Sequence, residues 1–251
     1  SQLNDFLCTM MKKQKIYSTC VKVLADTITP VGVYLKMRDH YPNALLLESS
    51  DYHSKEDSFS FICLQPMAGF EAKDKSYTIS NVDGSLEHFE VSSKNEMTSV
   101  FKDFLAQFDE VKSENPIGIC GVFGYTSFEA VQYFEDIDLQ DKEDAHKDNP
   151  DMKYQLFRYV LAIDHFKNQL YILKYGTSPL SADDPDFKKL HSQLKVERTE
   201  QFKFSKSGLE ESNLTDAEYE NAVSKGMDHC RRGDVFQVVL SREFKQGFKG
   251  D

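Results

Sequence analysis

The segment MKYQLFRYVLAIDHFKNQLYILKYG, residues 152–176, determines the fold class that the sequence predicts. It contains two long runs rich in β-branched and aromatic residues, which meet at Lys167-Asn168. Runs of this kind around a short polar turn are typical of a β-hairpin. We expect this hairpin to belong to a large antiparallel or mixed sheet.

Other strand-like runs surround this hairpin in the sequence. Asp83-Gly84 separates two short runs within residues 75–92, which predicts a second hairpin. Residues 116–135 read as an apolar strand interrupted by glycines and followed by a helix-like segment. Further strands are predicted at residues 15–26, 44–47 and 59–64.

Helices are predicted between these strands. Met97, Val100, Phe101, Phe104 and Leu105 recur at helical spacing, and Phe108 continues the pattern. Another helix begins after Thr29, with Pro30 in its first turn, and residues 184–202 give a third amphipathic pattern. Mixed hairpins and helices indicate an α+β fold, with mixed or antiparallel β-sheets and flanking helices.

The last predicted helix has defined ends. Thr215 and Glu218 form a capping-box pattern, and Gly233 is placed to end the helix. The next segment, DVFQVVLSREF at residues 234–244, is apolar without alternation, which predicts a strand buried on both faces. Few residues remain to supply its neighbours, so we expect the sequence to be the front part of a longer protein.

Composition limits the classes of function. The 251 residues carry a formal net charge of −11, so nucleic acid is not an expected partner. No apolar run is long enough to span a bilayer, and no signal-peptide pattern is present. The five scattered cysteines form no C-x-x-C pair and fit a reducing cytoplasm.

Common catalytic and nucleotide-binding motifs are missing. The sequence has no G-x-x-x-x-G-K-[ST], no G-x-G-x-x-G and no G-x-S-x-G. Acidic residues cluster around His146, but a solvated loop explains them better than a cation site.

One strand end has a pattern that allows ligand binding. The run LLLESS, residues 45–50, places Glu48, Ser49 and Ser50 directly after an apolar strand. Hydroxyls and backbone amides at such an end can hold the ammonium and carboxylate of a small ligand. On pattern alone, a core strand that ends at the surface is the more common explanation. Gln237, inside the apolar run near the end of the sequence, gives a weaker hint because a buried amide needs hydrogen-bond partners.

Three segments in order resemble one family. LLLES at 45–49, GVFGYTSFEAVQYFE at 121–135 and LTDAEYENAVSKGMDHCRRGDVFQVVLS at 214–241 resemble anthranilate synthase component I, over essentially the whole chain. The strongest match is GDVFQVVLS at 233–241, which looks like the family's G-D-I-F-Q-V-V-L-S. Related aminodeoxychorismate synthases usually have Asn where this sequence has Val239, which favours the anthranilate enzyme.

The resemblance implies an activity. Family members convert chorismate and ammonia to anthranilate and pyruvate in tryptophan biosynthesis. The full-length enzyme uses Mg²⁺, and a glutamine amidotransferase subunit supplies the ammonia. The alternatives are synthesis of 4-amino-4-deoxychorismate in the folate pathway and a non-catalytic ligand-binding or interaction module.

The resemblance also implies sites and domains. Leu47, Glu48 and Ser49 would line an allosteric pocket for L-tryptophan, with Ser50 beside them. Family members often have an Arg-Tyr-Ser-Phe-like entry to the next strand, and here Ser58 stands where that Arg would be. Residues 1–200 would form the regulatory N-terminal region and 201–251 the start of the chorismate-binding domain. We assign no catalytic residue and no metal ligand, and we expect these 251 residues to be inactive alone.

Overall fold

The computed structural model describes residues 13–48, 58–111, 117–137, 139, 149–196 and 203–250. The chain divides into two compact units, Ser1–Thr199 and Glu200–Asp251. The first unit is a nine-stranded mixed sheet with helices on its faces, and the second combines a two-stranded sheet with one helix. The predicted α+β class is confirmed.

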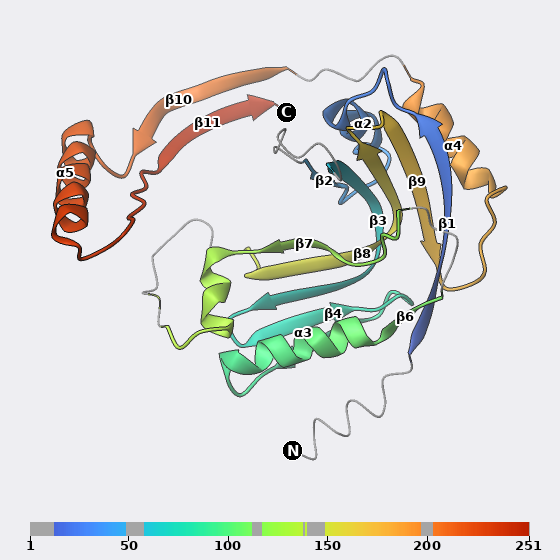
Figure 1. Cartoon of the computed structure of the whole chain (residues 1–251), viewed down its shortest axis with the longest axis horizontal. Coiled ribbons are helices and arrows are strands. Elements are labelled where there is room, and N and C mark those ends of the chain that lie inside the picture. The colour runs from blue at the N-terminus through green and yellow to red at the C-terminus, as the bar shows by residue number, and fades with distance from the viewer. Residues whose placement is uncertain are drawn as a thin grey trace. The chain divides into compact units, whose positions relative to one another are not determined.

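The sheet of the first unit is built around the hairpin predicted at Lys167-Asn168. Its main path runs β5-β4-β3-β8-β9-β1-β6, with β2 on β3 and β7 on β8 (Figure 1). All pairs are antiparallel except β1 with β6. The strands are β1 Gln14–Leu24, β2 Leu45–Leu47, β3 Phe59–Lys73, β4 Ser76–Ser80, β5 Leu86–Glu90, β6 Phe108–Glu110, β7 Phe123–Thr126, β8 Met152–Asp164 and β9 Gln169–Gly176.

The long pair β3–β8 joins two halves of the sheet. The first half of β3 also pairs with β2, and its second half pairs with β4. A bulge between Pro66 and Ala68 separates the two halves, and Gln65 beside it has a φ of 58°. Proline is tolerated at a bulge because no ladder hydrogen bond is lost there. The strand predicted at 59–64 therefore continues through Pro66 to Lys73.

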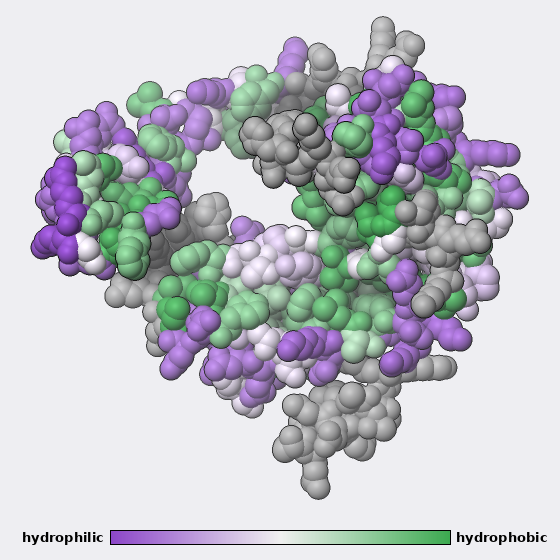
Figure 2. Space-filling view, in the orientation of Figure 1, coloured by the Kyte–Doolittle hydropathy of each residue, from purple (hydrophilic) through white to green (hydrophobic). Residues whose placement is uncertain are grey.

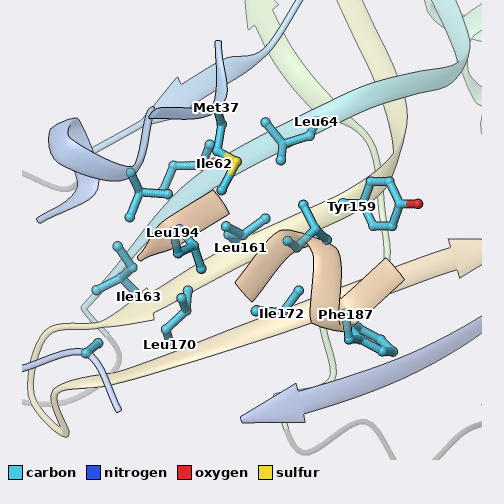
Figure 3. Packing of buried hydrophobic residues seen from close by; sticks show 13 residues of the cluster. Met37, Ile62, Leu64, Tyr159, Leu161, Ile163, Leu170, Ile172, Phe187 and Leu194 are labelled. Atoms are coloured by element: carbon cyan, nitrogen blue, oxygen red, sulfur yellow. The ribbon is translucent and has the colours of Figure 1, made fainter. Parts of the chain in front are cut away.

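Two helices cover one face of the part of the sheet that contains the first half of β3. These are α2, Pro30–Met37, and α4, Pro185–Leu194, which starts at a cap made by Asp184. The predicted Thr29 cap is confirmed, because its hydroxyl accepts a hydrogen bond from the amide of Gly32 at 3.1 Å. Figure 3 shows their side chains packed on those of the strands, a cluster that we call the outer core: Met37, Ile62, Leu64, Tyr159, Leu161, Ile163, Leu170, Ile172, Phe187 and Leu194.

Two further clusters complete the first unit. On the opposite face of β3, β8 and β9 lies the inner core, which includes Cys63, Val160 and Tyr175. Helix α3, Met97–Ala106, packs on the second half of the sheet through Met97 and Phe104, after the short 3₁₀ turn Lys94–Glu96. A second 3₁₀ segment, Phe128–Tyr133, adds Ala130 and Tyr133 to the α3 cluster. The helix-like part predicted within 116–135 is thus a 3₁₀ segment.

The second unit is described by itself. Strands β10, Phe204–Ser212, and β11, Phe244–Gly250, form an antiparallel pair, and α5, Asp216–Arg232, lies between them in sequence. The predicted capping box of Thr215 and Glu218 is confirmed, and Gly233 ends the helix with a φ of 79°. This φ is in the left-handed region that favours glycine.

The prediction of a buried strand at residues 234–244 is wrong. Residues 234–243 belong to no strand of this unit, and the side chains of Phe236 and Val239 are 107% and 81% exposed. A strand buried on both faces needs neighbours in its sheet, and the two-stranded sheet of this unit consists of β10 and β11 alone. Two predicted helices also end early, α3 at Ala106 before β6 and α4 at Leu194.

Candidate functional site

The candidate site begins where β2 ends. Leu47 is the last residue of β2 and is paired with Phe61 of β3. Leu45 packs on the inner core and Leu46 on the outer core, as alternating side chains of a strand should. The same alternation places Leu47 on the inner side of the sheet, where it is half-buried.

The four residues predicted to bind a ligand are partly described. Glu48 follows the strand as an exposed residue, next to the half-buried Leu47. Ser49 and Ser50 lie outside the described residues. The structure thus places an exposed acidic residue directly beside an apolar strand end. The role of the four residues in ligand binding stays a prediction.

A row of phenylalanine rings lies on the same face as Leu47. Phe59 and Phe61 are stacked with centroids 6.1 Å apart, and the ring of Phe123 is 5.6 Å from that of Phe61. Phe157 continues the row in an edge-on contact at 6.5 Å. We call Phe59, Phe61, Phe123 and Phe157 the aromatic row. It offers an apolar wall on which a flat ring can stack.

Sequence reasoning missed this row. The alternation Phe59-Ser60-Phe61 does signal two rings on one face of a strand. Phe123 comes from β7, however, a strand that pairs with a different part of the sheet. No pattern along the chain connects Phe123 to β3, so only the folded sheet brings these rings together.

The opposite face of the same strand carries a polar contact. Ser60 is fully buried, and its hydroxyl lies 2.7 Å from Nε2 of His165. The neighbouring Asp164 is also buried, and its Oδ1 accepts hydrogen bonds from the amides of Phe166 and Lys167. Its Oδ2 lies 3.2 Å from the Lys167 ammonium. Asp164 therefore holds the β8–β9 turn, and the geometry does not make it a partner that orients His165 for catalysis.

A buried lysine joins β9 to the start of α4. Nζ of Lys174 donates to Asp184 at 2.7 Å and to Asp186 at 2.6 Å. The Tyr159 hydroxyl also donates to Asp186, at 2.6 Å. Burial acts to lower the pKa of Lys174, but the hydrogen bonds to both aspartates outweigh it and raise that pKa. The Lys174 ammonium group thus finds its hydrogen-bond acceptors within the same unit, which fits a structural role.

A cavity of about 240 Å³ lies between α3, β6 and the segment before β7. Its lining is largely apolar and includes Ile16, Phe108 and Val122, with Glu110 and Cys120 as its polar members. Burial and the nearby Glu110 raise the pKa of the Cys120 thiol to about 11. The thiol is therefore protonated at neutral pH, and Cys120 is not an activated nucleophile.

A second cavity, of about 340 Å³, lies on the last turns of α5. Two of its basic residues lie beside aspartates, because Arg231 lies 3.3 Å from Asp228 and Arg232 lies 3.1 Å from Asp234, which is outside the lining. Within the described ranges, no group of three or more His, Cys, Asp or Glu residues is arranged to hold a metal ion.

None of the helices in the described part of the chain is long and apolar enough to cross a membrane.

Comparisons with known proteins identify relatives. The sequence model of the chorismate binding enzyme family matches residues 43–251. The chain is 27% identical to anthranilate synthase component 1 of Thermus thermophilus, over 87% of this chain and 45% of the relative. It is 29% identical to the protein of the same name from Lactococcus lactis, over 90% of this chain and 48% of the relative. The chain thus spans about half the length of the curated relatives it matches.

Among solved structures, the chain is similar to anthranilate synthase component I from Streptococcus pneumoniae, with a TM-score of 0.46 and 18% identity. The match covers 88% of this chain and 48% of that one. So weak a likeness does not define the fold, which rests on the strand pairing described above. The family rests instead on the sequence model, which matches well over half of the residues. The chain belongs to the chorismate binding enzyme family.

Proposed function

We propose that this chain is part of an anthranilate synthase component I, which converts chorismate and ammonia to anthranilate and pyruvate. The match of the chorismate binding enzyme family to residues 43–251 carries the proposal. Relatives named anthranilate synthase component 1 support it, from Thermus, Lactococcus and Aquifex. A glutamine amidotransferase subunit is the partner we propose as the source of ammonia.

We propose that the catalytic groups and the Mg²⁺ site of this enzyme lie outside the chain. The chain spans about half the length of its relatives, and its described residues hold no metal-binding cluster. We derive no catalytic step from the residues at hand, and we expect the 251 residues alone to release no anthranilate from chorismate. We place the enzyme in the cytoplasm, because the four described cysteines are free thiols.

The contribution that we assign to this chain is feedback regulation. L-tryptophan would bind at Leu47, Glu48, Ser49 and Ser50. Leu47 lies on the face of the aromatic row, which suits the indole ring, and the exposed Glu48 suits the ammonium group. Binding there would favour a conformation with low affinity for chorismate. Such coupling between two sites is typically worth about 1–3 kcal/mol.

Isothermal titration of L-tryptophan into the chain tests the regulatory site, with D-tryptophan as the control. We expect heat of binding for the L isomer alone. Equal heats for both isomers, or binding that is unchanged in Glu48→Ala, would contradict the assignment of this strand end.

A second candidate activity is the synthesis of 4-amino-4-deoxychorismate, because the same family match fits it. Val239 favours anthranilate, since the related enzymes usually have Asn at that position. Product analysis separates the two activities. The chain would be fused to the second half of the Lactococcus lactis relative and supplied with chorismate, Mg²⁺ and ammonium. We expect anthranilate, and accumulation of the aminated, non-aromatic product would contradict the first proposal.

A further inference from the structure

Arg158 lies at an interruption in the pairing of the central strand β8. The register of β3 with β8 passes from Leu64, opposite Tyr159, to Pro66, opposite Phe157, and gives Arg158 no partner. The pairing of β8 with β9 ends at Tyr159, and its pairing with β7 does not reach Arg158 either. Arg158 is therefore the one residue of β8, a strand described throughout, that pairs with no neighbouring strand.

The guanidinium group of Arg158 lacks an acceptor for one of its donors. Its Nε is buried without a hydrogen-bond partner, and within the described ranges no ion pair joins Arg158 to another residue. Phe157 and Tyr159 on either side are buried, and hydrophobic side chains gather along β3 and β8 in Figure 2. Arginine keeps its charge in proteins, and a donor that is shielded from water without an acceptor is costly. An anionic acceptor would remove this cost, as the two aspartates do for Lys174.

Gln65 of β3 stands opposite Arg158 in this interruption. Its φ of 58° lies in the left-handed region, which costs energy for a residue other than glycine. The bulge between Pro66 and Ala68 follows directly. Bulges and strained residues are frequent beside binding sites, where they redirect a side chain. The exposed carboxamide of Gln65 adds two N–H donors next to those of Arg158.

The position of Gln65 sets it apart from comparable residues. The other non-glycine residues with positive φ in the described part of the chain are Asn43, Asp74 and Asn168. They lie between elements, and their short polar side chains tolerate the left-handed region. Gln65 has a long side chain and lies inside a strand. A turn therefore explains the other three, whereas the strain at Gln65 needs another reason.

We propose that Arg158 and Gln65 form a binding site for a carboxylate group. The guanidinium fork matches the two oxygens of a carboxylate, and the carboxamide of Gln65 supplies a further donor to the same group. A carboxylate there would balance the charge of Arg158 and accept a hydrogen bond from its Nε. The strained backbone at Gln65 is kept because it places this carboxamide at the site.

The site is separate from the strand end proposed to bind tryptophan. Leu47 pairs with Phe61, which is opposite Ala162 of β8. Four residues of extended strand, about 13 Å, separate Ala162 from Arg158. The carboxylate site therefore does not rest on the proposed function, and a change at Glu48 should leave it intact.

Titration of the whole chain with benzoate, followed by NMR, tests the proposal. The probe is the Nε–H signal of Arg158, which is assigned by its loss in Arg158→Lys. We expect benzoate to shift this signal saturably, and benzamide, which has the same ring but no charge, to leave it in place. The Glu48→Ala variant should respond to benzoate like the wild type.

Two arginine variants separate the guanidinium fork from its charge, with affinity measured on the amide signals of Gln65 and Phe157. Arg158→Lys keeps the charge and loses the fork, so we expect it to bind benzoate roughly tenfold more weakly or worse. Arg38→Lys is the matched control in the same unit, because Arg38 already lies 3.8 Å from the carboxylate of Asp39. It should bind benzoate like the wild type.

Gln65→Gly tests the strained residue. Glycine adopts a positive φ freely, so this variant should resist urea at least as well as the wild type. It lacks the carboxamide, so it should bind benzoate more weakly. Asn168→Gly, which changes a residue with a φ of 50° in the β8–β9 turn, is the control and should bind benzoate normally.

The enzyme fused to the second half of the Lactococcus lactis relative distinguishes two sources of the carboxylate. If a small molecule supplies it, benzoate should shift the Arg158 signal as it does in the chain alone. If an Asp or Glu side chain of the second half supplies it, the signal should be shifted before benzoate is added.

Several results would overturn the carboxylate site. One is an Arg158 signal in the chain alone that ignores benzoate or responds equally to benzamide. Another is normal binding of benzoate by Arg158→Lys or by Gln65→Gly. Equal weakening in the Arg38→Lys or Asn168→Gly controls would also contradict it, because the effect would then not be specific to the interruption in β8.

Discussion

Lys174 is a buried residue whose charge is balanced by two carboxylates at the start of α4. We predict that Lys174→Met lowers the free energy of unfolding by about 2 kcal/mol, because hydrogen bonds to charged groups are lost and the aspartates keep their charge. Urea unfolding measures this loss. Lys188→Met, on the exposed side of α4, is the control and should be nearly neutral. Equal losses in both variants would contradict the role of Lys174.

The same cluster predicts a pH dependence with a defined sign. Hydrogen bonds from Lys174 lower the pKa of Asp184 and of Asp186 below their usual 3.8. Their contribution to stability is therefore complete above pH 3.8 and is lost as the pH falls through the lowered values. The pKa of Lys174 is raised above 10.5, so its contribution is complete below that pH and is lost above it.

The difference in unfolding free energy between the wild type and Lys174→Met measures this dependence directly. We expect it to be constant across the neutral range and to shrink at both ends, below pH 3.8 and above pH 10.5. A difference that grows on acidification would contradict the assignment, because it would mean that the carboxylates are stabilised in their protonated form.

Among the elements, β7 depends on a glycine for its close approach to β8. A Cβ on Gly124 would overlap the carbonyl oxygen of Lys153, whereas a Cβ on Gly121 meets nothing within 4 Å. We predict that Gly124→Ala destabilises the first unit by about 1–3 kcal/mol, because the strands must separate to admit the methyl group. Gly121→Ala should have little effect. Thermal unfolding of both variants distinguishes them, and similar melting temperatures would contradict the prediction.

Local signals explain which elements the sequence predicts well. The hairpin at Lys167-Asn168 and the capping box at Thr215 depend on residues close together in the chain, and both are confirmed. The apolar run interrupted by glycines within residues 116–135 also predicted a strand, and β7 forms there. Helix ends were less predictable. Phe108 continues the helical spacing of α3, yet it is the first residue of β6. It pairs with Gln14 of β1, because the edge of β1 offers backbone hydrogen bonds there.

Non-local structure explains the failures. The run Val235–Leu240 has strand-like residues, but residues alone do not supply a neighbouring strand, so the segment is exposed. The polar strand β10, Phe204–Ser212, was missed because its exposed side chains give no clear apolar alternation. At the candidate site, Leu47 and Glu48 were found from a local motif. The aromatic row beside Leu47 required the folded sheet.

For the whole molecule, the proposed regulation requires that tryptophan at the Leu47 strand end alter activity elsewhere. In the enzyme fused to the second half of the Lactococcus lactis relative, we predict that Ser49→Phe weakens inhibition by L-tryptophan. The ring would fill the space of the ligand, and a loss of binding free energy of about 1–3 kcal/mol, the typical cost of overpacking, raises the inhibitory concentration by roughly 5–150-fold. The measurement is anthranilate formation against L-tryptophan concentration, with saturating ammonium.

Ser92→Phe is the matched control for this experiment, because Ser92 is an exposed serine at a bend that follows β5. It should be inhibited like the unsubstituted enzyme. If Ser49→Phe lost activity without tryptophan, its effect would be structural, so the uninhibited rates must agree before inhibition is compared. With equal rates, inhibition of Ser49→Phe at the original tryptophan concentration would show that the effector binds elsewhere. The strand end at Leu47 would then be a core strand that reaches the surface.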